Sequence, residues 1–351
     1  MTRIGSLTLA AVAISLAGCS ITGPSSVATG RSAYNRIINK TEDEQILSLI
    51  VHERYDETYG LLAVSSVTSS IKTTVRAASE LGFGPTSNYD GNLVPLTIGA
   101  AYEENPTISY VPLAGEAFLQ RALEPMSLHD TYLMARASQD CTKMFQFMVR
   151  RLNGLANAIP GHMGPSPGFL RAGLAFETLH RQGSTELVRS EEDIYYIALL
   201  NYTGHEDDIR EFLEAVSLQD VEVTGQPILL PLQMGLGKVP GHLVIETRSV
   251  IDLVRAIGDA IEIPAAHLES GVVEAIPPSR VAHSRFLNIR SSKRPPTNAS
   301  VATKHRGYWF YISLDDTQSK RAFVLLRTLI GIRLSDPTIP SRAPALTIPV
   351  N

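Results

Sequence analysis

The sequence predicts an α+β fold, and three observations lead to this prediction. Residues 61 to 81 and 94 to 111 alternate between apolar and polar side chains, as strands with one solvated face do. Residues 32 to 55 and 115 to 155 repeat apolar residues at helical spacing. The last third mixes strand patterns with capped helices. We therefore expect a helical N-terminal and middle part with a long amphipathic β-hairpin, followed by a C-terminal antiparallel sheet with packed helices.

The first 18 residues have the pattern of a secretory signal segment. Arg3 supplies a positive charge, and Leu7 to Leu16 is a short apolar stretch that ends in small residues before Cys19. This stretch of ten residues, interrupted only by Thr8 and Ser15, is too short to span a bilayer as a helix. We expect residues 1–18 to be removed and residues 19–31, which are rich in small residues, to form a flexible tether.

Residues 32–112 are predicted to contain two helices and the hairpin. Tyr34 and Ile50 belong to an apolar series at helical spacing, and Thr41 with the acids after it resembles a cap between two helices. Residues 61 to 81 would also fit a helix, but Val, Ile, Thr and Ser dominate there and favour a strand. Asp90-Gly91 supplies the turn.

Two roles are open for this hairpin. It can cover the core of its own chain, which is the interpretation that we favour, since a hairpin packed on helices is ordinary. Alternatively, several subunits can each contribute a hairpin to an oligomeric barrel in the outer membrane, where a strand needs only about 9–11 residues.

Residues 113–220 are predicted to be mainly helical, with a helix-helix-helix-hairpin order like that of a winged-helix module. No basic recognition face accompanies that order, so protein contact or scaffolding is the better interpretation. Helices are expected over Gly115 to Leu123, from Ser127 with Asp130 as its capping box, over Met144 to Leu152, over Pro167 to His180, and from Thr203 to Leu218. Short strands are expected at Glu186 to Arg189 and Ile194 to Leu200.

Residues 221–351 are predicted to form an antiparallel sheet with helices. Tyr308 to Ile312 is interpreted as a core strand whose Trp309 and Tyr311 face away from the core, with a binding shelf as the alternative. Strands are expected at Ile228 to Gln233, His242 to Thr247, Arg285 to Arg290 and, at an edge, Leu346 to Val350. Helices are expected after the caps Ser249 with Asp252 and Asp315 with Gln318, and Lys293 to Asn298 is expected to be an exposed loop.

Composition bounds the function class. A hydrophobic content of 44% and a charged content of 19% describe a globular chain of 351 residues with a sizeable core. The formal net charge is −4, and removal of Arg3 makes it one unit more negative. This argues against a nucleic-acid partner. The chain has two cysteines, Cys19 and Cys141, and the apolar neighbours of Cys141 indicate a buried, inert thiol.

Three motifs that resemble catalytic or ligand-binding sequences fail on physical grounds. Gly164 to Gly168 matches GxSxG, but Pro167 follows Ser166 and has no N–H to serve as an oxyanion donor. Gly235 to Gly241 lacks the spacing of a phosphate loop and precedes a strand, so we interpret it as a hairpin turn. His205 to Asp208 fits the acidic first turn of a helix. The nine histidines show no metal-ligand spacing.

Leu16-Ala17-Gly18-Cys19 resembles the lipobox of bacterial lipoproteins. The resemblance implies cleavage between Gly18 and Cys19, and lipidation of Cys19 with a diacylglyceryl thioether and an acylated amino terminus. Ser20 is not the Asp that is associated with inner-membrane retention, so the resemblance implies the outer membrane. Three acyl chains, at about 0.8 kcal/mol per buried CH₂, would hold the protein there firmly.

The body resembles a group of uncharacterised proteobacterial lipoproteins. The similar stretches are Pro106 to Glu116, Glu246 to Ser249, and Gly307 to Ile312 with the following residues to Phe323. The resemblance supports the class and the location and supplies no catalytic residues.

We therefore expect a lipid-anchored, non-enzymatic protein of the cell envelope, facing the periplasm, with a structural or assembly role. Its partners would be the membrane and either further copies of itself or another envelope protein, with no nucleic acid, cofactor or metal. One alternative is an envelope hydrolase that uses paired carboxylates among Glu116, Asp130 and Asp316. The other is an oligomeric β-barrel export component.

Overall fold

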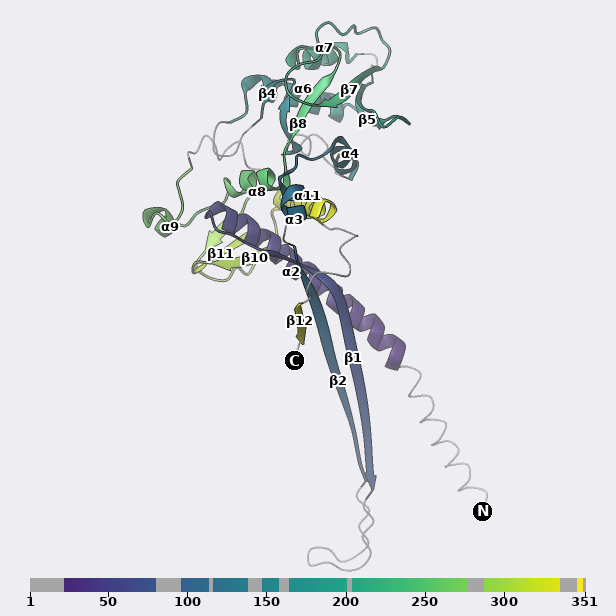
Figure 1. Cartoon of the computed structure of the whole chain (residues 1–351), viewed down its shortest axis with the longest axis vertical. Helices are drawn as coiled ribbons and strands as arrows, with labels where there is room; N and C mark the ends of the chain where they lie inside the picture. The colour runs from purple at the N-terminus through teal and green to yellow at the C-terminus, as the bar shows by residue number, and fades with distance from the viewer. Residues whose placement is uncertain are drawn as a thin grey trace, which may run out of the picture. The chain divides into compact units, whose positions relative to one another are not determined.

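The fold is α+β, and the chain divides into two compact units. One unit, the body, comprises Met1–Gly60 and Ala114–Ser335, and the other, the hairpin unit, comprises Leu61–Leu113 and Asp336–Asn351. The computed structural model (Figure 1) describes residues 22–79, 96–113, 116–137, 147–157, 164–200, 204–276, 287–334 and 346–349.

The described part of the body combines helices with two sheets. One sheet has the strand order β10-β11-β9, and the other has the order β4-β3-β8-β7-β6-β5. The helices are α2 (Thr22–Arg54), α3 (Glu116–Leu123), α4 (Leu128–Ala137), α6 (Pro167–Arg181), α7 (Glu206–Ala215), α8 (Val250–Gly258), α9 (Ala265–Glu269) and α11 (Thr317–Leu334). The strands are β3 (Val149–Leu152), β4 (Leu155–Ala156), β5 (Thr185–Arg189), β6 (Tyr195–Leu199), β7 (Ile228–Met234), β8 (Leu243–Thr247), β9 (Arg290–Ser292), β10 (Ala299–His305) and β11 (Tyr308–Ser313).

The C-terminal part of α2 is the central buried helix of one half of the body. Leu47, Ile50 and Val51 have no exposed surface, because their spacing of three and four residues places them on one stripe of the helix. Helix α2 contacts β10 and α8, and α8 and α11 also contact α3 and each other. Residues from both ends of the sequence therefore build this half of the core.

Helix α2 is continuous where two helices were predicted. The hydroxyl of Thr41, predicted as a cap, donates to the carbonyl of Ile38 within the helix, at 2.9 Å. Glu42 and Asp43, predicted as a first turn, instead lie 2.7 and 3.1 Å from the guanidinium of Arg327 on α11. The acids thus form a contact between two helices, which local sequence could not reveal.

The predicted tether also differs from the structure over its described part. Residues 22–31 belong to α2 and are helical. Pro24 lies in the first turn, where a helix needs no N–H donor, so it does not prevent this extension.

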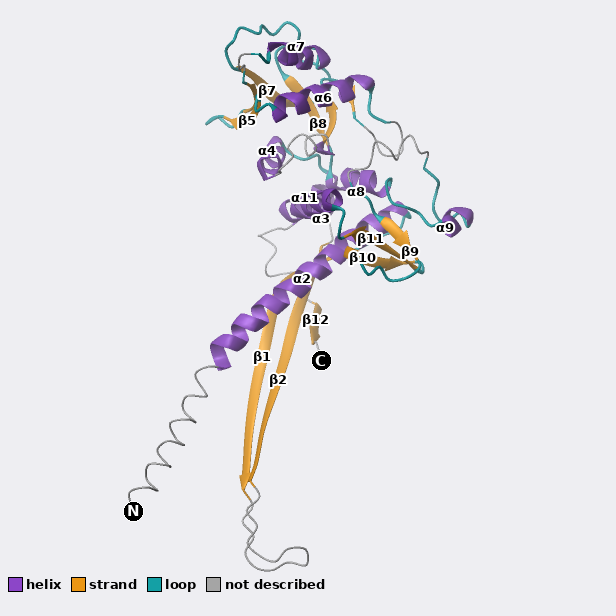
Figure 2. Cartoon of the chain, turned by 180° about the vertical axis from the view of Figure 1, so that it is seen from behind, coloured by secondary structure: helices purple, strands orange, loops and turns teal. Residues whose placement is uncertain are grey.

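The six-stranded sheet combines the middle and last thirds of the chain. Residues 149–152, predicted as the end of a helix, form β3, which pairs with β8 so that Val149 lies opposite Thr247. Strands β7 and β8 of the last third therefore share a mixed sheet with strands of the middle third. The expected antiparallel sheet of the last third is formed by β9, β10 and β11. Four residues with two apolar ends fit a helix or a strand equally well, and here pairing with a distant strand decides. Helices α6 and α7 pack on each other beside this sheet (Figures 1 and 2).

The prediction of a hairpin turn at Gly235 to Gly241 was wrong, because β7 and β8 pair in parallel. Parallel neighbours usually need a crossover of a dozen residues or more. Here the pairing begins only at Leu232 and Leu243 and ends at Met234 and Ile245. Because the paired stretch is only three residues long, the loop between Met234 and Leu243 has to bring the chain back by only the length of that stretch.

Three predicted helix starts are confirmed by their hydrogen bonds. The Ser249 hydroxyl accepts from the N–H of Asp252 while the Asp252 carboxylate accepts from the N–H of Ser249, which is a complete capping box. Ser127 and Asp130 form the same reciprocal pair. Ser166 caps α6, with Pro167 in its first turn.

The predicted core strand at Tyr308 to Ile312 is confirmed as β11. Phe310 and Ile312 have no exposed surface, whereas Trp309 and Tyr311 are half-buried, as the alternation predicted. Of the expected strand at Arg285 to Arg290, the first two residues lie outside the described residues, and β9 begins only at Arg290. The residues from Lys293 to Asn298 form the expected loop.

The hairpin unit contains the predicted long hairpin. Strands β1 (Leu61–Ser79) and β2 (Leu96–Leu113) pair antiparallel along their length, with one irregularity between Val64 and Ser66. The short strand β12 (Leu346–Pro349) pairs with residues 107–110 of β2, which confirms the predicted edge strand at the C-terminus. The predicted turn at Asp90-Gly91 lies outside the described residues.

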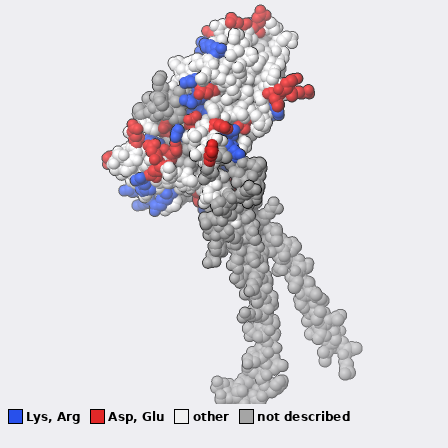
Figure 3. Space-filling view, viewed as in Figure 1, with Lys and Arg blue, Asp and Glu red and all other residues white. Residues whose placement is uncertain are grey.

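Two surface properties complete the description. Among the described residues, no helix combines the length and the apolar character needed to span a bilayer. On the face of the body in Figure 3, basic and acidic side chains lie interspersed.

The buried stripe of α2 leads to a stability prediction. Leu47→Ala should lower the free energy of unfolding by about 2–5 kcal/mol, because it removes buried methyl groups from a site with no exposed surface. The lone tryptophan, Trp309, is in the same unit and can report urea unfolding by its fluorescence. Leu119→Ala is the matched control: its side chain is 56% exposed and its loss should cost less than about 0.5 kcal/mol. Equal effects of the two substitutions would contradict the assigned core.

Candidate functional site

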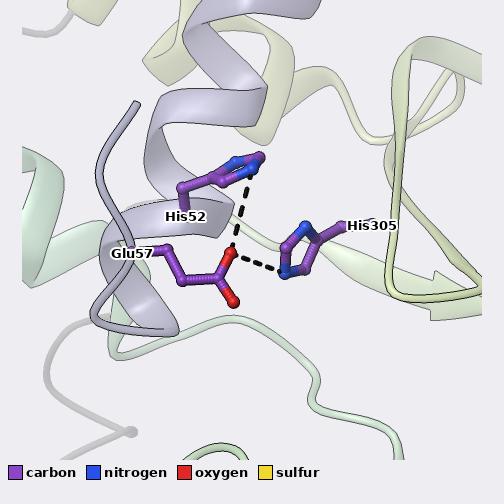
Figure 4. Close-up of side chains that lie close together, drawn as sticks. All are labelled: His52, Glu57 and His305. Atoms are coloured by element: carbon purple, nitrogen blue, oxygen red, sulfur yellow. Dashed lines mark ion pairs between the residues drawn. The ribbon is translucent and has the colours of Figure 1, made fainter. Parts of the chain in front are cut away.

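Two histidines and a glutamate meet where the end of α2 approaches the turn between β10 and β11 (Figure 4). His52 lies in the last turn of α2, Glu57 follows the end of that helix, and His305 ends β10. One ring nitrogen or carboxylate oxygen from each residue lies within 4.8 Å of the others. We call this group the His-Glu-His cluster.

The end of α2 places Glu57 beside His52 by a Schellman motif. Asp56 has a positive φ of 55°, the left-handed conformation that ends many helices. The N–H of Glu57 then donates to the carbonyl of His52 at 2.9 Å, and the N–H of Asp56 donates to that of Glu53 at 3.2 Å. The chain reverses, and Glu57 returns to the level of His52.

A tight turn places His305. Arg306 and Gly307 both have positive φ, 43° and 84°, and His305 lies opposite Tyr308 in the ladder. This is a two-residue hairpin loop of type I′, which twists in the same sense as the strands it joins. The turn also brings the guanidinium of Arg306 to Glu57.

The two oxygens of Glu57 have different partners. Its Oε1 accepts from Nε of Arg306 at 2.8 Å, with a second guanidinium nitrogen at 2.6 Å. Its Oε2 lies 3.4 Å from Nε2 of His305 and 4.0 Å from Nε2 of His52. Nδ1 of His52 lies 2.7 Å from the carbonyl oxygen of Ser48, which accepts a hydrogen bond when that nitrogen carries the proton. In both Glu57 and His52, one polar atom is thus held by a residue outside the cluster, and the other faces the centre of the cluster.

Aromatic rings surround the cluster. Tyr55 packs edge-on against His305 at 4.8 Å between ring centroids, and Tyr59 packs against His52 at the same separation. The hydroxyl of Tyr55 lies 2.6 Å from Nδ1 of His267 in a buried hydrogen bond. Burial raises the pKa of Tyr55 to about 12, so its hydroxyl stays protonated at neutral pH.

The charges of the cluster follow from burial and pairing. Burial lowers the pKa of His305 and outweighs the nearby Glu57 carboxylate, which acts to raise it. Burial would raise the pKa of Glu57, but the hydrogen bond from Arg306 and the neighbouring His305 lower it on balance. At neutral pH the cluster therefore contains a carboxylate facing a neutral His305, which is a donor set suited to a metal ion or to proton transfer.

Sequence inspection missed this cluster. His52 and Glu57 are five residues apart, across a helix end, and His305 lies far along the chain. No metal-binding motif has that spacing. Near His52 the sequence shows only a helix end followed by Asp56 and Glu57, and this pattern does not indicate that a distant histidine lies beside them.

The predicted site residues fall in two groups. Gly18, Cys19 and Cys141 lie outside the described residues, so lipidation, cleavage and the state of Cys141 remain predictions. The motifs set aside as non-catalytic have local roles where they are described. Ser166 caps α6, and the acids after His205 lie in the first turn of α7.

The three carboxylates of the hydrolase alternative occupy different helix starts. Glu116 is exposed in the first turn of α3. Asp130 belongs to the capping box of α4 and lies 3.2 Å from the guanidinium of Arg333. Asp316 precedes α11. Each of the last two is engaged in bonds that hold the fold.

Asp316, not the predicted Asp315, caps α11. Its carboxylate accepts from the N–H and the hydroxyl of Ser319 and from the side-chain amide of Asn288, at 2.7–3.0 Å. Burial acts to raise the pKa of Asp316, but these hydrogen bonds outweigh it and lower the pKa below its ordinary value. A lowered pKa is the opposite of what a general acid needs at neutral pH.

Compared with protein-family models, with curated proteins and with solved structures, the chain matches none. Inferences about its function therefore come from its own residues.

The Asp316 cap leads to a pH prediction. Asp316→Ala should lower the free energy of unfolding by about 0.5–2 kcal/mol at pH 7, the usual cost of losing a cap. The folded pKa lies below the unfolded value of about 3.9, so this contribution is present above that pH and is lost as pH falls through the folded pKa. Urea unfolding of both proteins at pH 7 and pH 3 measures the difference. A difference that does not shrink at pH 3 would contradict the assignment.

Proposed function

We propose that this chain is a lipid-anchored protein at the periplasmic face of the outer membrane, and that it assembles with further copies of itself through its long hairpin. The observation that supports assembly is strand β1. It spans 19 residues and lies at an edge of its sheet, with β2 on one side and no described strand on the other.

An edge strand of this length is a strong template for pairing. In an antiparallel pair, every second residue directs its N–H and C=O groups away from the partner strand. At a free edge, about half of the backbone groups therefore have no strand to bond with. Natural proteins usually keep such edges short or cover them. The outer side of β2 is covered by β12 only at residues 107–110, among the described residues. The hairpin therefore offers two long edges to other strands.

The register gives the hairpin one mainly apolar face. It places Val67 opposite Ile108, Val75 opposite Ala100 and Ala77 opposite Ile98, with Ile71 opposite Glu104 as an exception. The intervening positions are mainly polar and include the pair of Lys72 and Glu103. A two-stranded hairpin is marginal by itself, and three or more strands or a packed face are needed for stability. Copies that pair edge to edge would supply those strands.

The lipid anchor supports assembly by concentrating the chains. Three acyl chains at Cys19 would confine every copy to one membrane surface, where an edge meets other edges more often than in solution. The support for the anchor is the lipobox and the signal segment before it.

A second candidate function is an oligomeric β-barrel export component. It is favoured by strand length, since β1 and β2 have 19 and 18 residues, whereas a membrane-spanning strand needs about 9–11. At about 3.3 Å per residue the hairpin is roughly 60 Å long, which exceeds the apolar band of a membrane. Conductance of the purified protein in planar bilayers, lost on deletion of residues 66–104, would distinguish this function from assembly outside the bilayer.

The anchor is tested by Cys19→Ala. We expect the wild type in the outer-membrane fraction with labelled palmitate attached, and the variant in the soluble periplasmic fraction without it. The physical reason is that the acyl chains supply the membrane affinity. A wild-type protein that carries no label, or a variant that stays in the outer membrane, would contradict the proposal.

Assembly is tested by two neighbouring lysine substitutions on β1. Val75→Lys places a charge on the apolar face opposite Ala100, and Thr74→Lys places one on the polar face opposite Ala101. We expect in-cell cross-linking to capture oligomers of the wild type and of Thr74→Lys, and to lose them in Val75→Lys. Pairing edge to edge sets a strand of the next copy beside β1, and a lysine at position 75 would lie among the apolar side chains of that strand. Equal cross-linking of all three proteins would contradict assembly through this hairpin.

A further inference from the structure

We propose that His52, Glu57 and His305 bind one divalent transition-metal ion of the Zn²⁺ class, through Nε2 of each histidine and Oε2 of the glutamate. This inference is independent of the proposed assembly, because all three residues belong to the body. Figure 4 shows the three side chains converging on one point from the end of α2 and from β10.

The separations of the donor atoms suit such an ion. Bonds of about 2.0–2.1 Å in tetrahedral geometry put neighbouring ligand atoms about 3.3–3.4 Å apart. Oε2 of Glu57 lies 3.4 Å from Nε2 of His305 and 4.0 Å from Nε2 of His52. All the donors lie within 4.8 Å of one another. The pair of Glu57 and His305 thus already has the separation of two neighbouring ligands, and the His52 side chain has to move inward to complete the set.

In His52 and Glu57 the atom that does not face the ion is held by a neighbour, as is usual for metal ligands. Nδ1 of His52 lies at hydrogen-bond distance from the Ser48 carbonyl, which fixes the tautomer with a lone pair on Nε2. Oε1 of Glu57 accepts from Arg306, which orients the carboxylate and leaves Oε2 for the ion. The hydroxyl of Ser48 in turn bonds that of Thr303 on β10, at 2.6 Å, which ties the two ligand-bearing elements together.

His305 supplies an independent indication of a ligand. Its side chain is only 9% exposed, and its buried Nε2 has no hydrogen-bond partner in the described structure. Buried polar atoms are almost always paired, and an unpaired one calls for an explanation such as an ion. A metal at the centre of the cluster would bond this nitrogen directly.

The donor set selects the kind of metal. Two imidazoles with one carboxylate suit Zn²⁺ and its neighbours in the first transition row, whereas Ca²⁺ and Mg²⁺ prefer oxygen ligands. Three protein ligands leave one position for water or for another molecule. Glu57 and His52 remain partly exposed, at 28% and 23% of their side chains, so an ion can reach the site.

The test uses the full mature protein, stripped with a chelator and then titrated with Zn²⁺ in a calorimeter. We expect one ion per chain. Co²⁺ in place of Zn²⁺ should give the visible absorption of a four- or five-coordinate ion. His52→Gln and Glu57→Gln should each weaken binding at least about 10-fold, since each removes a ligand. His180→Gln is the matched control, because His180 also lies in the last turn of its helix but outside the cluster.

Folding of each variant is checked by Trp309 fluorescence, because Trp309 lies on β11, the strand that pairs with the one carrying His305. His305→Gln removes a buried ring and can prevent folding. In that case Glu57→Gln tests the site, because this substitution leaves the buried rings in place. Saturable one-to-one binding that the ligand variants lose and His180→Gln keeps would support the site. Wild-type protein that binds no Zn²⁺, or ligand variants that bind it as tightly as the wild type, would overturn it and leave the cluster as an ion-pair network around Glu57.

Discussion

The packing of α2 against β10 and α8 is the interaction on which much of the body depends. It joins residues near the start of the chain to strands and helices near its end, and Leu47, Ile50 and Val51 lie wholly inside this contact. The same helix then ends in a Schellman motif that returns Glu57 beside His52. Because β10 is held against the helix, His305 arrives at the same place. The His-Glu-His cluster is therefore a product of core packing.

The hairpin unit obeys a different constraint. A strand must satisfy its backbone groups on both sides, with other strands or with water, and β1 has a described neighbour on one side only. Its alternation also leaves an apolar face. Both features are explained together if the hairpin is one part of a sheet that several chains complete, and a lipid anchor would hold those chains on one surface. The body and the hairpin unit would then have separate tasks, the first to carry the cluster and the second to join copies.

Local patterns in the sequence predicted most of the elements and some of their details. The alternation in β1 and β2, the capping boxes at Ser127 and Ser249, and the inward Phe310 and Ile312 all depend on neighbours in sequence, and the structure confirms them. Several of the errors share one cause. Residues 149–152 became a strand because β8 pairs with them, and Glu42 became part of a helix contact because Arg327 meets it. The His-Glu-His cluster was missed for the same reason, since a single sequence does not show which distant residue the fold places beside a given helix end.

Amide hydrogen exchange along β1 in the protein within its native membrane tests the central claim of assembly most directly. Pairing with β2 protects only alternate residues of an edge strand, whereas a neighbour on each side protects nearly all of them. Assembly predicts slow exchange at consecutive amides from Val67 to Ser79, and faster exchange at every second amide once the protein is diluted as the unlipidated monomer. Alternating fast and slow amides in the membrane-bound protein would show that the outer edge of β1 pairs with nothing, and would contradict the account.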